Sequence, residues 1–354
     1  MKFIVLAACI FSGTVFAQSF TTIDAPGAGT GSGQGTYGVA INEAGTIVGW
    51  YSDSRLVYHG FLRASSGTIT TFDVAGAGTH FGQGTYAQAI NSKGAIAGYY
   101  VDSSKVSHGF VRASGGTMTT FDAPGAGAGN YQGTTAYSVN GNNQVAGTYE
   151  DSNGSLHGFV RSAGGKFTTF DVPGAGTGGG QGTVVYSGNK AGSTTGYYAN
   201  IGAASGFVRT SDGSFTTFTP TQPVQSTFPY SINEAGEIAG YYYDTNDLSH
   251  GFLRSASGAI TSFDAPGAGT GPIQGTFGFS INKSGGITGF YKDINDGVHG
   301  FVRNSSGTIA TFDVPGAGTV PFQGSIPSGI NTAGDITGHY VDTAGVLHGF
   351  LRTQ

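Results

Sequence analysis

Histidine and aspartate recur along the chain at a fixed spacing, and these two side chains together can do chemistry. Five histidines each precede an aspartate by 14 residues: His59 and Asp73, His108 and Asp122, His157 and Asp171, His250 and Asp264, and His299 and Asp313. A histidine hydrogen-bonded to an aspartate is half of the catalytic triad of many hydrolases. The same contact can also be a charge-assisted hydrogen bond that only holds two strands together.

The number of pairs and one exception favour the structural interpretation. Five equivalent pairs are more than one active site needs, and no part of the chain adds a serine in a sharp GxSxG turn. Where a further pair would fall, Ser205 and Thr219 replace both members together. Independent ligands would have less reason to disappear as a couple. We therefore expect a His–Asp hydrogen bond within each unit and assign no catalytic residue.

Two remaining members of this pattern stand at opposite ends of the chain. His348 has no aspartate after it, and Asp24 has no histidine before it. We predict that His348 pairs with Asp24, and that residues 20–24 form the outer strand of the unit completed by the last residues. Such a strand would close a ring and leave no open sheet edge between the ends.

The pairs belong to a repeat of about 49 residues that fills the chain from Phe20 to Gln354. The repeats cover about 20–69, 70–118, 119–167, 168–215, 216–260, 261–309 and 310–354. A period of this length with β-rich content indicates a propeller-like array. In the second repeat, residues 85–90, 95–101, 106–112 and 117–122 read as strands separated by turns. We predict an all-β, seven-bladed β-propeller of four-stranded antiparallel blades, forming one domain over residues 18–354.

Turn and core positions also recur in every repeat. An asparagine begins each first turn, and three residues later comes a glycine or, once, Asn143, which suits an Asx turn that needs a positive φ. A tyrosine in each second strand and a phenylalanine in each third strand are the expected core, within a composition of 65 Gly, 18 Tyr and 25 Phe that disfavours helices. The tyrosines are residues 51, 100, 149, 198, 242, 291 and 340, and the phenylalanines are residues 61, 110, 159, 207, 252, 301 and 350.

The first residues have the pattern of an export signal. Lys2 precedes an apolar run from Phe3 to Phe11, and the residues before Gln18 favour cleavage after Ala17. We expect residues 1–17 to be a signal peptide and the mature protein to be secreted or periplasmic. The segment ending at Cys9 mimics a lipobox, but the apolar stretch before it is too short, so a lipoprotein is disfavoured. No other segment has the length and apolarity of a membrane span.

Charge and ligand chemistry exclude several classes of partner. The formal net charge is −5 and the basic residues are dispersed, which argues against nucleic acid. Cys9 is the only cysteine and leaves with the signal peptide, so the mature protein has no disulfide or cysteine metal site. Histidines on different blades would ring the disc rather than converge on a metal ion. The Asp-rich turns lack the spacing and the closing glutamate of an EF-hand. We expect no metal and no cofactor.

Polar residues recur in the loops that we expect on one face of the disc. A PGAGT element followed by QGT connects each outer strand to the next inner strand, and alternating strand directions place these loops beside Asp-containing turns. We predict a binding surface on this loop face. Its candidate residues are Asp53, Asp102, Asp151, Asp244, Asp293 and Asp342, with Gln34, Gln83, Gln132, Gln181, Gln274 and Gln323.

These features support three hypotheses about function. The first is a non-enzymatic binding or structural propeller that holds a glycan or another extracellular polymer through many weak sites. The second is a polysaccharide hydrolase or lyase, with its site at the centre of the ring or at an irregular notch between blades four and five. This enzyme would need paired carboxylates there, and inner strands such as 37–41 and 86–90 contain none. The third is a scaffold for other proteins.

The repeats resemble a known family. The HGF element, the GxIxGYY element and the INxxG turn recur in order over residues 20–354 and resemble the probable extracellular repeat family named for its HAF motif. This chain reads HGF where the family name has HAF, and its fourth unit reads Ser205, Gly206, Phe207. The resemblance implies an exported bacterial repeat protein of undetermined activity, and it supplies no catalytic residues. The diagnostic elements of Kelch and WD repeats are not seen.

Overall fold

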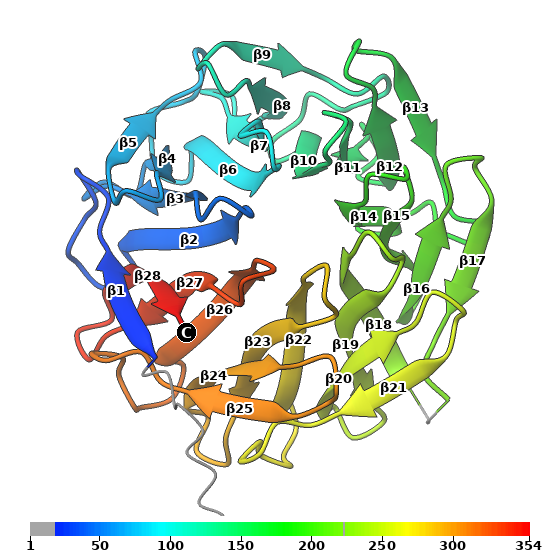
Figure 1. Cartoon of the computed structure of the whole chain (residues 1–354). Helices are drawn as coiled ribbons and strands as arrows, with labels where there is room; N and C mark the ends of the chain where they lie inside the picture. The colour runs from blue at the N-terminus through cyan, green and yellow to red at the C-terminus, as the bar shows by residue number, and fades with distance from the viewer. Residues whose placement is uncertain (1–17, 222–223) are drawn as a thin grey trace, which may run out of the picture.

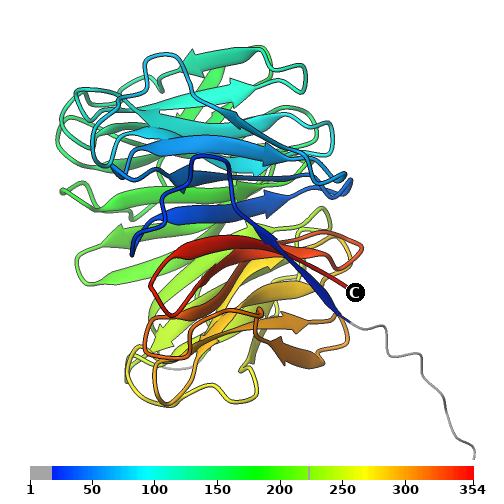
Figure 2. The same ribbon diagram turned by 90° about the vertical axis from the view of Figure 1, so that its left-hand side faces the viewer.

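Residues 18–221 and 224–354 are described in a computed structural model of the chain, and within them every regular element is a β-strand. The 28 strands form seven antiparallel sheets of four strands, which we call blades, arranged in a ring (Figure 1). Viewed from the side, the ring is a thick disc (Figure 2). The described residues contain no helix with the length and apolarity of a membrane-spanning segment.

Each blade uses its strands in the same order from the centre outwards. The inner strands are β2 (Gly35–Ile41), β6 (Gly84–Ile90), β10 (Gly133–Val139), β14 (Gly182–Gly188), β18 (Val224–Ile232), β22 (Gly275–Ile281) and β26 (Gly324–Ile330). The second strands are β3 (Ile47–Ser52), β7 (Ile96–Val101), β11 (Val145–Glu150), β15 (Thr194–Asn200), β19 (Ile238–Asp244), β23 (Ile287–Lys292) and β27 (Ile336–Val341).

The third strands are β4 (Tyr58–Arg63), β8 (Ser107–Arg112), β12 (Leu156–Arg161), β16 (Ala203–Arg209), β20 (Ser249–Arg254), β24 (Val298–Arg303) and β28 (Leu347–Thr353). The outer strands are β1 (Ser19–Ile23), β5 (Ile69–Phe72), β9 (Met118–Phe121), β13 (Phe167–Phe170), β17 (Phe215–Phe218), β21 (Ile260–Phe263) and β25 (Ile309–Phe312). The strands predicted for the second repeat have the same ends as β6 to β9 in some places, and in the others they begin or end one residue away.

The first strand of the chain completes the seventh blade. β1 pairs antiparallel with β28 from Ser19 opposite Thr353 to Ile23 opposite Gly349. Both views show β1 lying against β28 (Figures 1 and 2). Ile23 is only 1% exposed and packs with Ile47, Tyr51 and Phe61 of the first blade. The terminal strand therefore contributes to the core as well as covering a sheet edge.

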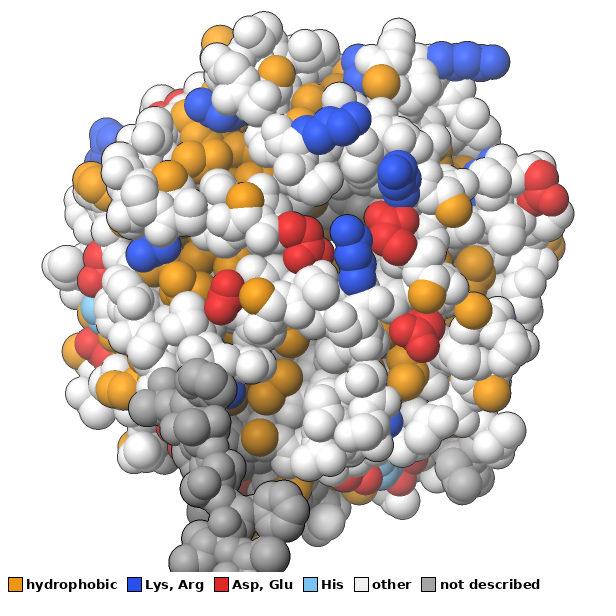
Figure 3. All heavy atoms as spheres, viewed as in Figure 1, with side chains coloured by type: hydrophobic (Ala, Val, Ile, Leu, Met, Phe, Trp, Pro, Cys, Tyr) orange, Lys and Arg blue, Asp and Glu red, His pale blue; other side chains and the backbone are white. Residues whose placement is uncertain are grey.

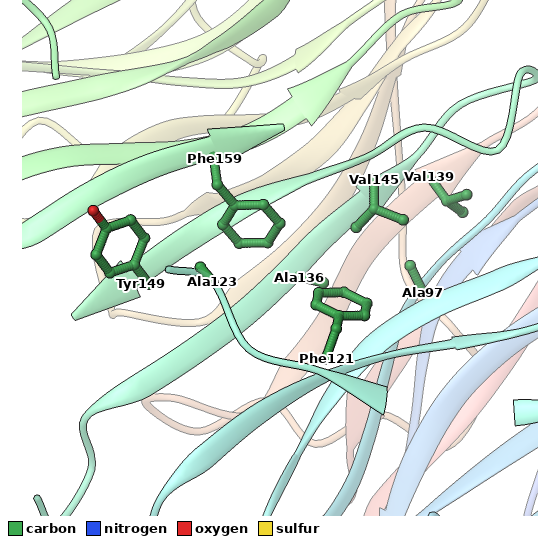
Figure 4. Packing of buried hydrophobic residues seen from close by; sticks show 8 residues of the cluster. All are labelled: Ala97, Phe121, Ala123, Ala136, Val139, Val145, Tyr149 and Phe159. Carbon is green, nitrogen blue, oxygen red and sulfur yellow. The ribbon is translucent and has the colours of Figure 1, made fainter. Parts of the chain in front are cut away.

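The core lies between neighbouring blades, as the repeated aromatic positions predict. All seven third-strand phenylalanines are fully buried, and six of the seven second-strand tyrosines are buried, with Tyr198 partly buried. In Figure 4, Phe121 of the second blade belongs to one buried cluster with Phe159, Val145 and Tyr149 of the third blade. Arginines that end the third strands stack on a phenylalanine of the preceding blade, as Arg161 does on Phe121 at 4.7 Å.

The repeated asparagines connect the blades in a closed ring of hydrogen bonds. Asn42 Oδ1 accepts bonds from the backbone N–H groups of Ala44 and Thr46, so it forms the predicted Asx turn. Its Nδ2 donates to the carbonyl of Asn91 in the next blade. The same interblade bond joins Asn91, Asn140, Asn189, Asn233, Asn282 and Asn331 in sequence, and Asn331 donates back to Asn42. We call the side of the disc that carries these turns the asparagine face.

Candidate binding face

The opposite side of the disc, the loop face, carries the histidines and aspartates selected from the sequence. His59 Nδ1 lies 3.0 Å from the carboxylate of Asp73, and His348 Nδ1 lies 2.8 Å from that of Asp24. His108, His157, His250 and His299 lie 2.8 to 3.0 Å from Asp122, Asp171, Asp264 and Asp313. A hairpin turning near Ser65 and Gly67 is predicted from the sequence to place Asp73 opposite Gly60. This register is wrong by one residue, because Phe72 pairs with Gly60 and Asp73 therefore follows on opposite His59.

A second aspartate approaches the other nitrogen of each of these rings. His59 Nε2 lies 3.9 Å from Asp53, and His299 Nε2 lies 3.4 Å from Asp293. The remaining contacts are His108 with Asp102, His157 with Asp151, His250 with Asp244 and His348 with Asp342. The turn aspartates that we predicted as binding residues thus belong to the histidine clusters. The sequence signal was an aspartate six residues before each of these histidines.

Local structure fixes each cluster. Asp53 Oδ1 accepts bonds from the N–H groups of Arg55 and Val57, which shapes the turn between β3 and β4. The His59 ring stacks on Tyr51, with centroids 5.0 Å apart. In the third blade, the backbone N–H of Ser155 is the main influence that holds the pKa of Asp151 below its ordinary value. A carboxylate, a histidine and a second carboxylate therefore occupy defined positions at the rim of six blades.

The fourth blade lacks all three members of the cluster. Asn200, Ser205 and Thr219 occupy the positions of the turn aspartate, the histidine and the outer aspartate. A cavity of about 640 Å³ opens there, lined by Tyr198, Ser205, Thr217, Phe218, Thr219 and Thr221 with residues 258–260 of the next blade. Its lining contains no carboxylate, so the paired acids that a glycosidase would need are not among these residues.

Protonation of His59 is expected to stabilise the fold. The hydrogen bond that the His59 ring donates to the Asp73 carboxylate is the main cause that raises the pKa of His59. The contribution of the protonated ring to the free energy of unfolding is complete at pH values below the ordinary histidine pKa. It disappears as the pH rises through the raised pKa. We expect His59→Gln to lower the free energy of unfolding by about 0.5–1 kcal/mol at about pH 5.5 and by less at about pH 8.5, measured by urea denaturation.

The matched control for this prediction is His80→Gln. His80 is exposed and forms no ion pair within the described part of the chain. The control should change stability equally at both pH values. A loss of stability in His59→Gln that was constant across this range, or larger at the higher pH, would contradict the assigned role of the protonated ring.

The predicted glutamines hold the loops in place. Gln34 Oε1 accepts a bond from Gly31 N–H, and Gln34 Nε2 donates to the carbonyl of Ser54 in the adjacent turn. Gln83, Gln132, Gln274 and Gln323 form one or both of the equivalent bonds, and Gln181 lies against Gly176 and Gly178 of its own loop. Five of the six carboxamides thus form hydrogen bonds within the protein, where they position the loop.

Three bulky side chains, which the sequence reasoning missed, project from these loops. Tyr131, Ile273 and Phe322 have φ values of 67°, 57° and 65°, in the left-handed region. Their side chains remain exposed, at 66%, 53% and 65%. Gly33, Gly82 and Gly180 occupy the equivalent position, with similar φ, in three other loops. The signal in the sequence was the residue immediately before each loop glutamine. This residue is glycine in three loops and a large apolar residue in the other three.

A backbone contact that recurs from loop to loop explains why these residues stay in that conformation. Tyr131 N–H donates to the carbonyl of Lys105 at 2.7 Å, and Ile273 N–H donates to Asp247 at 2.7 Å. Phe322 N–H makes the same bond to Asp296 at 3.1 Å. Each loop is thereby fixed to a turn of the preceding blade, and the side chain at the bond is directed into solvent.

Other exposed apolar groups lie in the same loops and turns. Phe81 is 73% exposed, Ile294 is 75% exposed and Val320 is 54% exposed. Gln274 donates to the carbonyl of Ile294, and Phe322 is bonded to Asp296 of the same turn, so two loops contact one turn of the sixth blade. Lysine ammonium groups lie over two of the aromatic rings, Lys105 over Tyr131 at 5.6 Å and Lys292 over Phe322 at 5.3 Å.

Comparisons with known proteins identify the fold alone. No protein-family model matches the chain, and no curated protein matches it. Among solved structures, virginiamycin B lyase from Staphylococcus aureus is similar with a TM-score of 0.58 and 14% identity, over 96% of this chain and 100% of that one. The BP39L lectin from Burkholderia pseudomallei gives 0.54 and 11%, over 90% and 98%.

The propeller domain of the Trilobed protease from Pyrococcus furiosus gives a TM-score of 0.52 and 9% identity, over 91% of this chain and 94% of that one. The ring of blades is therefore a β-propeller fold. Its relatives in structure include a lyase and a lectin, so the function must be argued from the surfaces of this chain.

Proposed function

We propose that this protein is an exported, non-enzymatic β-propeller that binds an extracellular polysaccharide through its loop face. The proposal takes the ring to be a seven-bladed propeller and keeps the resemblance of its repeats to the family named for its HAF motif. It also takes residues 1–17 to be an export signal. Those residues lie outside the described part of the chain. Catalysis is assigned to no residue. The histidine clusters serve as supports that stiffen the rim of the blades.

The observation that carries the proposal is the left-handed backbone of Tyr131, Ile273 and Phe322. A non-glycine residue in this region costs about 1 kcal/mol or more, and a β-branched or bulky one is a marked outlier. Glycine would remove that cost, and three other loops use it. Strained residues with exposed apolar side chains are typical of binding sites, because stability alone would not retain them.

The chemistry of these side chains suits a polysaccharide. The aromatic rings of Phe81, Tyr131 and Phe322 can stack on the apolar faces of sugar rings, while neighbouring aspartates and backbone groups accept hydrogen bonds from hydroxyl groups. The loops repeat around the ring, so a long polymer can contact several of them together. Weak single contacts then add to a higher overall avidity.

The test is a triple variant, Tyr131→Gly, Ile273→Gly and Phe322→Gly, which installs the residue already used at the equivalent loops. We expect polysaccharide binding, measured by pull-down and by a glycan array, to fall at least about tenfold, since each apolar contact is worth about 1 kcal/mol or more. The same variant should unfold at a higher urea concentration than the parent chain, because the backbone strain is removed.

This pairing separates binding from folding. A stabilised triple variant that still bound polysaccharide with parental affinity would overturn the proposed surface. Absence of binding to any extracellular polymer by the parent chain would overturn the proposed function. Release of new reducing ends or unsaturated ends from the polymer would instead support the hydrolase or lyase hypothesis, and capture of a protein in place of a glycan would support the scaffold hypothesis.

A further inference from the structure

A cavity enters the ring along its axis from the asparagine face, opposite the loops discussed above. Its outer part, the mouth, has a volume of about 640 Å³, and its inner part, the passage, has a volume of about 470 Å³. Ile41, Ile90, Val139 and Ile330 line both parts, so the two are continuous. Figure 3 shows this face, with acidic and basic side chains gathered around the hollow at its centre.

The passage is aromatic on one side only. Each inner strand shifts register by one residue, and the extra residue of this bulge lies at the passage. In four consecutive blades this residue is Tyr137, Tyr186, Tyr230 or Phe279. Their rings form a chain of contacts, 5.6 Å, 4.5 Å and 4.9 Å between successive centroids. We call these four residues the aromatic arc.

The other three blades place smaller or polar side chains at the same position. These are Val39, Gln88 and Ser328, which line the passage opposite the aromatic arc. A ligand in the passage would therefore meet a flat apolar wall on one side and room with hydrogen-bonding groups on the other. This arrangement suits a sugar ring, which has one apolar face and a hydroxylated edge.

The mouth adds unpaired positive charge. Glu43 accepts hydrogen bonds from the backbone and hydroxyl of Thr332, and Glu234 accepts one from Lys190 N–H. Lys93, Lys190 and Lys283 also line the mouth, and none of their ammonium groups forms an ion pair among residues 18–221 and 224–354. The carboxylates thus have donors of their own, whereas the three lysines are available to an anion.

We propose that this axial cavity binds the terminal, carboxylate-bearing sugar of an acidic saccharide. The sugar ring would lie against the aromatic arc, and the carboxylate would be held by the lysines at the mouth. The inference rests on the proposed function in one respect, that the ligand is a saccharide. It adds a separate site on the opposite face and names the acidic class of sugar.

The experiment compares two soluble probes on the full chain by isothermal titration calorimetry, trigalacturonate and its neutral counterpart galactotriose. We expect trigalacturonate to bind at least about tenfold more tightly, with an affinity that falls as salt is added. The double variant Lys190→Ala and Lys283→Ala should lose at least about tenfold in trigalacturonate affinity and keep its weak affinity for galactotriose. Lys166→Ala, an exposed lysine outside the cavity, is the matched control and should bind as the parent does.

A second variant tests the aromatic arc with a residue the ring already uses. Phe279→Ser copies Ser328 of the seventh blade, and it should reduce affinity for both probes about tenfold while the chain remains folded by circular dichroism. The triple glycine variant of the loop face should bind trigalacturonate normally. Equal affinity for the two probes, no binding of trigalacturonate, or loss of its binding in the loop-face variant would each overturn the axial site.

These outcomes distinguish the two proposals. Failure of the axial site would appear in the soluble probes and leave polymer pull-down unchanged. If the loop-face proposal failed, the triple glycine variant would pull down as much polysaccharide as the parent chain. The loss of trigalacturonate affinity in the double lysine variant would still be observed.

Discussion

Replacing Ile23 with aspartate should lower the free energy of unfolding by about 4 kcal/mol or more, and we expect this to be the largest effect of any substitution in β1. Ile23 is 1% exposed and packs against Ile47, Tyr51 and Phe61. A carboxylate at this place would be buried without a donor, within the strand that completes the seventh blade. The measurement is equilibrium urea denaturation followed by tryptophan fluorescence and circular dichroism.

Thr21→Asp is the matched control, because Thr21 is an exposed residue of the same strand. It should change the free energy of unfolding by less than about 0.5 kcal/mol. If both variants were equally stable, β1 would not belong to the cooperative core, and the ring would be held closed by other contacts.

A second large effect is expected in the ring of asparagines. Asn282 is 8% exposed, donates through Nδ2 to the carbonyl of Asn331 at 2.8 Å, and accepts bonds from Ser284 and Gly286 N–H. Asn282→Asp keeps the acceptor but sets a carboxylate oxygen against that carbonyl. We expect a loss of about 3 kcal/mol near neutral pH, measured by urea denaturation.

Acid should partly reverse this loss, because a protonated aspartate can donate the missing bond. Asn295→Asp, in an exposed turn of the same blade, serves as the control and should have little effect at either pH. Parental stability in Asn282→Asp at neutral pH would show that the interblade bond contributes nothing measurable to the ring.

Most of the fold could be predicted from the repetition of the sequence. Seven equivalent units gave independent estimates of each strand, and the turns that begin with asparagine fixed the boundaries to within one residue in most places. The joint loss at Ser205 and Thr219 indicated a contact between residues 14 apart, and the end residues His348 and Asp24 completed the pattern. The structure places those two side chains 2.8 Å apart.

The parts of the candidate site that the sequence could not supply depend on geometry between units. Spacing alone did not show that Asp53 approaches the second nitrogen of the His59 ring, because that contact depends on the backbone conformation of the turn. The Asn42 to Asn91 bond joins different blades, so it needs the angle between them. The exposed Tyr131 was missed because its importance lies in φ, which follows from a backbone bond to Lys105.

The glutamines predicted for ligand contact have a second role, which the sequence did not show. A polar residue repeated in a loop is read as a ligand group when the loop path is unknown. Here the loop that follows the PGAGT segment has backbone N–H groups that need acceptors, and Gln34 accepts a bond from the N–H of Gly31, three residues earlier. The carboxamide was required for the shape of the loop.

The antiparallel contact between β1 and β28 places the two ends of the described chain beside each other, with the hydroxyl groups of Ser19 and Thr353 at 2.7 Å. Every boundary between blades is bridged by the same asparagine bond, including the boundary between the seventh blade and the first. The ring of blades therefore does not depend on which blade junction carries the ends of the chain. Circular permutants opened at any of the seven blade junctions and joined across the present ends should reach one and the same disc.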